Sequence, residues 1–107
     1  MRCMLIGAMA LFACEGEPDP EAVQEAQNAC IRECRARVAK NEDLSAGPCL
    51  SDALPGGLIA PDFVCDVAHD PRQDVDDEDE NQCQAYKDDR ADYFVEVDPS
   101  CSFIRAE

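Results

Sequence analysis

The stretch DPEAVQEAQNACIRECRARVAKN, residues 19–41, predicts one long helix and places two cysteines on it. Asp19 is a favourable N-cap, and Pro20 suits the first helical position, where its missing N–H is not needed. Acidic residues lie near the beginning and basic residues near the end, as the helix dipole favours. At about 100° per residue, Cys30 and Cys34 fall on one face of ordinary core width. We therefore expect the helix to bury both cysteines.

Six of the eight cysteines in the chain lie at or after position 30. An even number of cysteines in a small exported domain predicts a disulfide framework. Cys30 and Cys34 are four residues apart on a helix and point the same way, so we expect each to bond a different downstream segment. Six cysteines allow fifteen sets of disulfides, and this argument excludes only the sets in which Cys30 bonds Cys34. The predicted disulfide cysteines are Cys30, Cys34, Cys49, Cys65, Cys83 and Cys101.

The chain is acidic and poor in large apolar residues. It carries 24 acidic against 9 basic residues, a net charge of −15, and Leu, Ile, Val and Phe make up fewer than a fifth of residues 14–107. Such a composition is by itself typical of disorder, because a small core cannot offset roughly 1–2 kcal/mol of backbone entropy per residue. Three disulfides at about 2–4 kcal/mol each would stabilise the fold. The negative charge also opposes binding to nucleic acid, so no nucleic acid is expected as a partner.

The rest of the chain predicts short strands and loops. Residues 63–67 and 93–97 alternate in side-chain character as strands do, and the two strands could pair. Residues 80–92 are compatible with a helix, whereas residues 44–62 contain several Gly and Pro turn signals and are expected to be irregular. The predicted fold is α+β: a small disulfide-rich domain, residues 20–107, in which one long N-terminal amphipathic helix packs on short strands and loops.

The first thirteen residues have the zones of a secretory signal. One positive charge precedes an apolar run, residues 3–13, which would span roughly 16 Å as a helix and is too short to cross a bilayer. Leu11, Ala13 and Cys14 stand at the −3, −1 and +1 positions of a lipobox. The segment through Cys14 therefore resembles the signal peptide of bacterial lipoproteins.

This resemblance implies that residues 1–13 are removed and that Cys14 carries a diacylglycerol and an acylated amino group. Several acyl chains make such an anchor effectively permanent. Residues 14–19 would be the lipidated cysteine and a short acidic tether. Glu15 stands where Asp retains lipoproteins in the inner membrane, so the resemblance favours the outer membrane. Secretion without a lipid and an uncleaved cytosolic chain are the alternatives.

The densest cluster of charge is a run of six carboxylates in seven residues. Ca²⁺ takes six to eight oxygen ligands, so the run is a candidate cation loop. It lacks the EF-hand pattern, because Asp79 stands in place of the Gly and Ala85 in place of the bidentate Glu. The simpler interpretation is a solvated acidic loop, and we expect no resident metal or cofactor. The run consists of Asp74, Asp76, Asp77, Glu78, Asp79 and Glu80.

His69 is the only histidine and is followed by Asp70. No nucleophile elbow or comparable motif supports a catalytic triad, so we interpret His69 as a surface residue in a turn and expect no enzymatic activity. The cysteines lack the tight CxxC pairs of zinc ribbons, and export favours their oxidation to disulfides.

The sequence thus predicts a lipid-anchored, non-enzymatic binding or structural module of the bacterial cell envelope. Its charge favours a basic envelope or extracellular protein as partner. One alternative is a secreted disulfide-rich inhibitor or effector that acts through the apolar loop 55–61, held between Cys49 and Cys65. Another is a weak calcium-binding module that uses the acidic loop 74–80.

Overall fold

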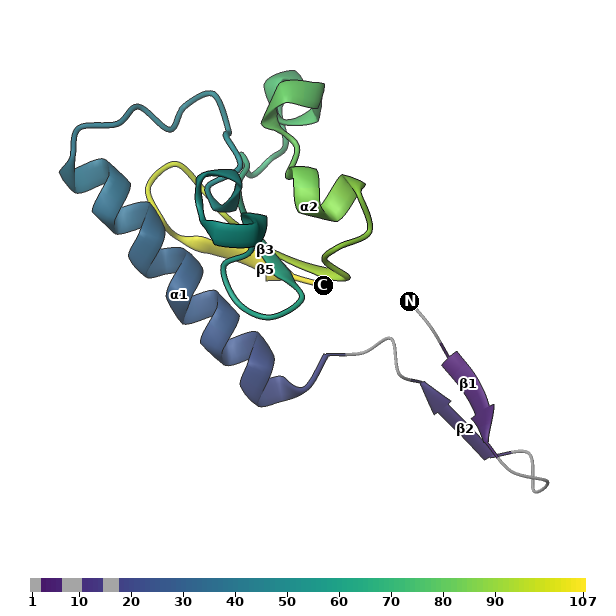
Figure 1. The fold of residues 1–107 in the computed structure, drawn as a ribbon. Coiled ribbons are helices and arrows are strands. Elements are labelled where there is room, and N and C mark those ends of the chain that lie inside the picture. Colours follow the sequence, from purple (N-terminus) through teal and green to yellow (C-terminus); the bar gives the residue numbers. More distant parts are fainter. Residues whose placement is uncertain (1–2, 7–10, 15–17) are drawn as a thin grey trace.

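The structure, a computed structural model, describes residues 3–6, 11–14 and 18–107 (Figure 1). Near the N-terminus, β1 (Cys3–Ile6) and β2 (Leu11–Cys14) pair in antiparallel fashion. β1 and the first three residues of β2 fall in the predicted signal peptide, residues 1–13, and residues 15–17 of the predicted tether lie outside the described residues. Removal of residues 1–13 and lipidation of Cys14 therefore stay predictions.

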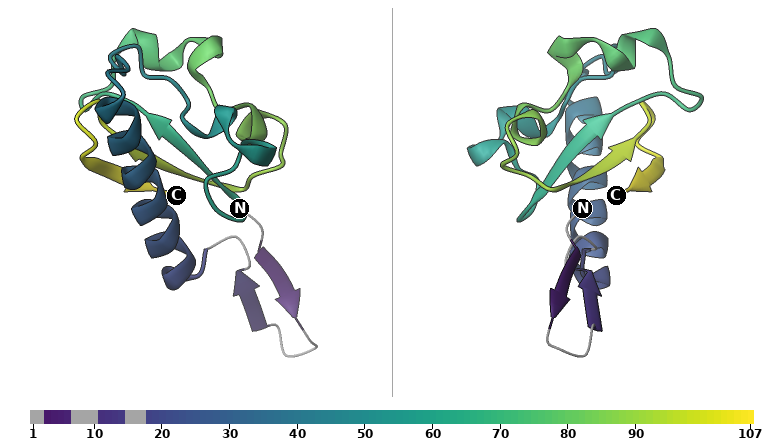
Figure 2. Two further views of the ribbon diagram at one scale, coloured as in Figure 1. Left: turned by 60° about the vertical axis from the view of Figure 1, so that its left-hand side comes forward. Right: turned by 90° about the vertical axis from the view of Figure 1, so that its right-hand side faces the viewer.

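The predicted N-terminal helix is confirmed as α1 (Pro20–Ala39). Oδ2 of Asp19 accepts a hydrogen bond from the backbone N–H of Ala22 at 3.2 Å, which satisfies one of the free donors of the first turn. The helix ends just before Asn41, whose φ of 65° is left-handed and turns the chain away. Figure 2 shows α1 lying across one face of the sheet.

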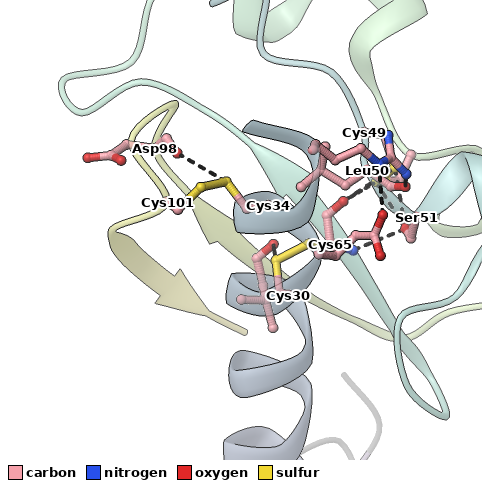
Figure 3. Close-up of a disulfide and its surroundings, with 12 residues drawn as sticks. Cys30, Cys34, Cys49, Leu50, Ser51, Cys65, Asp98 and Cys101 are labelled. Atoms are coloured by element: carbon pink, nitrogen blue, oxygen red, sulfur yellow. Dashed lines mark hydrogen bonds and ion pairs between the residues drawn. A yellow bond between two sulfur atoms is a disulfide. The ribbon is translucent and has the colours of Figure 1, made fainter. Parts of the chain in front are cut away.

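The sheet has three strands in the order β3–β4–β5. β3 (Phe63–Val67) and β4 (Tyr93–Val97) are the two predicted strands and run parallel, whereas β5 (Phe103–Ala106) is antiparallel to β4 and was not predicted. The outer edge of β3 is covered by the preceding loop, because the N–H of Leu50 donates to the carbonyl of Cys65 at 2.9 Å (Figure 3). Backbone groups on that edge are thereby satisfied.

Each face of the sheet has its own apolar cluster. Toward α1, Cys65, Val67 and Val95 are fully buried against Cys30 and Cys34 of the helix. On the opposite face, short helical turns and loops cover a second cluster, which consists of Cys49, Val64, Cys83, Ala85 and Ala91. Side chains along each strand therefore alternate between the two faces and pack into two separate cores. Polar groups are also buried on the face turned away from α1.

The second face is covered by four 3₁₀ turns and one short helix. The turns are η1 (Ser51–Ala53), η2 (Pro55–Gly57), η3 (Asp74–Asp77) and η4 (Asp79–Asn81), and the helix is α2 (Gln84–Lys87). The predicted helix over residues 80–92 is wrong. Only α2 forms there, and it ends after one turn. Asp89 takes a left-handed φ of 61°, and the N–H groups of Arg90 and Ala91 both donate to the carbonyl of Ala85. None of the helices in the described part of the chain is long and apolar enough to span a membrane.

Within residues 18–107 three disulfides join the elements, and all six predicted cysteines take part. Cys30 bonds Cys65 on β3 with a Cα–Cα distance of 5.4 Å. Cys34 bonds Cys101 in the β4–β5 connection, with Cα atoms 5.6 Å apart (Figure 3). The third disulfide, Cys49–Cys83, has a Cα–Cα distance of 5.1 Å and lies on the other face of the sheet. The helix is thus bonded to two different downstream segments, and the predicted small disulfide-rich α+β domain is confirmed.

Candidate functional site

The sheet face turned away from α1 carries two adjacent carboxyl groups. Asp66 on β3 and Glu96 on β4 are direct partners in the parallel register. Both side chains point to the same face as Val64, because residues two apart on a strand share a face. Asp66 is 9% exposed and Glu96 5% exposed. Two buried acidic groups side by side need compensation from their surroundings.

Glu96 receives this compensation from two arginines. Nη1 of Arg72 donates to Oε2 of Glu96 at 3.0 Å, and Nε of Arg105, from β5, donates to Oε1 at 2.7 Å. Arg72 also bonds Asp77 at 2.8 Å. These hydrogen bonds, first to Asp77 and then to Glu96, hold the pKa of Arg72 above its ordinary value. Glu96 is therefore held between two guanidinium groups, one hydrogen bond to each of its oxygens.

Asp66 lacks such compensation. Its Oδ1 is buried and has no hydrogen-bond partner among the residues that the structure describes. Burial, followed by the charge of Glu96, raises the pKa of Asp66 to about 8, although Arg72 acts in the opposite direction. The carboxyl group of Asp66 is consequently protonated at neutral pH.

A cavity of about 160 Å³ opens beside these groups. The ring of Tyr86 stands edge-on to the ring of Phe94, with 5.5 Å between their centroids. The guanidinium of Arg105 lies 5.5 Å from the centroid of Phe94. We call this cavity the Asp66 pocket. Its lining consists of Val64, Asp66, Arg72, Gln82, Cys83, Tyr86, Phe94, Glu96 and Arg105.

The histidine is not the surface residue that the sequence predicts. Nδ1 of His69 lies 2.9 Å from Oδ1 of Asp76, a buried residue of η3, and the His69 side chain is 15% exposed. Oδ2 of Asp76 accepts from the backbone N–H groups of His69 and Gln73, both at 2.9 Å. Burial acts to raise the pKa of Asp76, but these hydrogen bonds hold it below its usual value. His69 thus pairs with Asp76 instead of its neighbour Asp70, and the pair fixes the loop after β3.

A glycine makes room for this buried carboxylate. A Cβ atom at Gly47 would stand 2.5 Å from Oδ1 of Asp76, and Gly47 has a φ of +71°. Both observations require glycine at this position. The loop before β3 therefore closes directly over Asp76.

The acidic run does not converge on one point. Asp76 is turned inward, Asp77 bonds Arg72, and Asp79 bonds Lys87 at 2.8 Å. The remaining members of the run are exposed: Asp74, Glu78 and Glu80. Within the described part of the chain, the one grouping of potential metal ligands is Cys49, Asp52 and Cys83, and its two sulfurs form a disulfide. Disulfide sulfurs are not thiolate ligands, so this grouping offers no metal centre.

The apolar loop 55–61 folds back on the domain. Leu58 is half-buried against the second core, and Ile59 and Ala60 pack against the first. Nη1 of Arg90 donates to the carbonyl of Gly56 at 2.8 Å and holds the turn in place. The loop therefore uses its apolar side chains internally.

Sequence reasoning missed the Asp66 pocket, although a signal for it exists. The strands FVCDV (63–67) and YFVEV (93–97) each carry one acidic residue at their fourth position, between apolar residues. A carboxylate at a buried strand position is unusual unless it is paired. Parallel pairing of the two strands in equal register would have placed the two carboxylates together.

Comparisons of the chain with protein-family models, with curated proteins and with solved structures found no match. The geometry of the site therefore carries the functional argument.

Proposed function

We propose that this protein is an exported lipoprotein of the bacterial envelope whose disulfide-stabilised domain binds a ligand in the Asp66 pocket without chemical turnover. The observation that carries the proposal is the buried Oδ1 of Asp66, which within residues 18–107 has no hydrogen-bond partner. A buried polar atom left unpaired costs about 1–3 kcal/mol. A ligand that supplies the partner recovers this free energy, and perturbed carboxyl groups beside a cavity are typical of functional sites.

Export is supported by the disulfides and by the N-terminal sequence. Disulfides persist in oxidising compartments, and three of them link residues spread from Cys30 to Cys101. The segment ending at Cys14 resembles a lipoprotein signal. The net charge of −15 keeps the domain off anionic surfaces and attracts basic partners.

The surroundings of the two carboxyl groups favour binding over catalysis. A pair of carboxyl groups on neighbouring strands invites comparison with glycosidases, in which one acts as acid and the other as base or nucleophile. Here both oxygens of Glu96 already accept hydrogen bonds from arginines, so neither is free to attack a substrate or to accept a proton from a water molecule. The volume of the cavity, about 160 Å³, corresponds to one small group. The Asp66 pocket is suited to holding one small group.

The export and anchor proposal is tested by the intact mass of the protein from a bacterial membrane fraction, before and after reduction. We expect the mass of residues 14–107 plus acyl chains, with an increase of about six hydrogens on reduction of the three disulfides. The Cys14→Ala variant is the control and should lack the acyl mass. A soluble chain with free thiols would contradict the proposal.

The binding proposal is tested by the thermal stability of the purified protein at pH 7 in the presence of small amines, carboxylates and alcohols. A ligand of the Asp66 pocket raises the melting temperature of the wild type and leaves that of Asp66→Asn unchanged. If none of these classes, and none of a wider set of sugars and peptides, shows a difference between the two proteins, the proposed binding function is wrong.

A further inference from the structure

We propose that the Asp66 pocket takes a primary ammonium group, such as the head of a lysine side chain on a partner protein, with Asp66 as its counter-ion. This inference rests on the proposed function and names its ligand class. It is carried by the position of the buried Oδ1 of Asp66, by the aromatic and apolar lining of the cavity, and by the charges around it.

The shape and lining of the pocket fit an ammonium on a short alkyl stem. An ammonium group has three donors, so it can bond Asp66 and a further acceptor at once. Val64 and Phe94 provide apolar surface for the stem, and the ring of Tyr86 can attract the cation. A cavity of about 160 Å³ is comparable in size to cavities that accept benzene, and a butyl chain with its head group is of similar bulk.

The two arginines of the lining do not oppose a cation, because each is already neutralised. Arg72 bonds Asp77 and Glu96, and Arg105 bonds Glu96 and lies 3.5 Å from Glu107. An anionic ligand would have to compete with these carboxylates for the guanidinium groups. It would also meet the negative charge of the whole domain.

The groups that face Asp66 come from several elements, and most are acidic. Glu96 on β4, Asp76 on η3 and Asp52 on η1 act against its ionisation, whereas Arg72 favours it. A bound ammonium adds the positive charge that these surroundings lack and permits Asp66 to ionise. Neutral and anionic ligands provide no such compensation.

Binding should therefore release a proton. Asp66 is protonated at neutral pH because its pKa is about 8, and the ammonium needs its carboxylate form. The O–H bond of Asp66 breaks, the proton passes to solvent, and the ion pair forms; no other bond changes. The affinity should rise about tenfold per pH unit up to about pH 8 and then level off, while the amine remains charged to about pH 10.

The pH dependence of the affinity can be measured directly by isothermal titration. The wild type is titrated with n-butylammonium chloride at pH 6, 7 and 8, at constant ionic strength. Repeating each titration in two buffers with different ionisation enthalpies counts the protons released. We expect close to one proton released at pH 6 and 7, and an affinity about tenfold higher at pH 7 than at pH 6. Binding without proton release would overturn the inference.

Variants separate the pocket from the general charge of the domain. Asp66→Asn should lose the binding, whereas Glu78→Gln, which makes the same carboxyl-to-amide change at an exposed position of the acidic run, should keep it. Tyr86→Leu, at a side chain that is 43% exposed, should weaken the affinity about two- to fivefold. If Asp66→Asn fails to fold, the Tyr86→Leu variant and the proton count decide: either an unchanged affinity in Tyr86→Leu or binding without proton release overturns the inference.

Sodium butyrate and 1-butanol distinguish this inference from the proposed function. Neither should bind the wild type measurably under the same conditions. If one of them binds and Asp66→Asn abolishes that binding, the pocket is a binding site for another ligand class, and only the ammonium inference is wrong. If the affinity for n-butylammonium is equal in the wild type and Asp66→Asn, the ammonium does not use this pocket.

Discussion

Asp66 couples the stability of the folded domain to pH. Its pKa is about 8 in the folded protein against an ordinary value of 3.8, so between these limits the folded state holds a proton that the unfolded chain has lost. Stability must then fall as pH rises through this window, by at most about 1.4 kcal/mol per pH unit. The lowered pKa of Asp76 changes the pH dependence of stability only below its ordinary value of 3.8, so it does not mask the effect of Asp66.

Denaturant unfolding of the wild type and of Asp66→Asn at pH 5, 6.5 and 8 tests this coupling. We expect the free energy of unfolding of the wild type to fall relative to the variant as the pH rises, because Asn cannot ionise. Stabilities that differ by the same amount at all three pH values would contradict the shifted pKa of Asp66.

The Asp76 carboxylate should contribute more to stability than any other member of the acidic run. Asp76→Ala leaves the N–H groups of His69 and Gln73 without their acceptor, and we expect a loss of about 2–4 kcal/mol. The urea midpoint measures the loss. Asp74→Ala, at an exposed position of the same run, is the matched control and should stay within about 0.5 kcal/mol of the wild type.

At the scale of elements, Arg37 connects α1 to the loop before β3. Its side chain is 15% exposed, and it donates from Nη2 to the carbonyl of Leu50 and from Nε to Glu33, both at 2.7 Å. We expect Arg37→Ala to lower the free energy of unfolding by about 1–3 kcal/mol, measured by denaturant unfolding. Arg35→Ala, on the exposed side of the same helix turn, should have little effect; equal losses would contradict the role of the Leu50 contact.

Elements with strong periodicity could be predicted from the sequence, and those shaped by tertiary contacts could not. α1, β3 and β4 have clear patterns and, for the helix, a clear N-cap. β5 is only four residues long and alternates between exposed and half-buried, so its pattern is weak. The helix predicted over residues 80–92 ends early because contacts back to Ala85 override local propensity. The Asp66 pocket depends on the register between β3 and β4, which is not a local property of either strand.

At the scale of the whole molecule, the small core makes the fold depend on its disulfides. We expect the Cys49→Ala/Cys83→Ala double variant to lose about 2–5 kcal/mol, because this bond closes a loop with a sequence separation of 34 residues. For a domain of this size the melting temperature should fall by roughly 10 °C or more. Calorimetry of the purified variant measures this, and Ser45→Ala, at an exposed loop position, serves as control. An unchanged melting temperature would contradict the dependence on this bond.

The disulfide loops also overlap along the chain, because each loop contains at least one cysteine of another disulfide. The three loops are Cys30–Cys65, Cys34–Cys101 and Cys49–Cys83. Any single cut of the backbone between residues 30 and 101 therefore leaves both fragments covalently joined. A protease that nicks an exposed segment such as residues 77–80 detaches nothing from the molecule. A nicked molecule therefore stays in one piece until its disulfides are reduced.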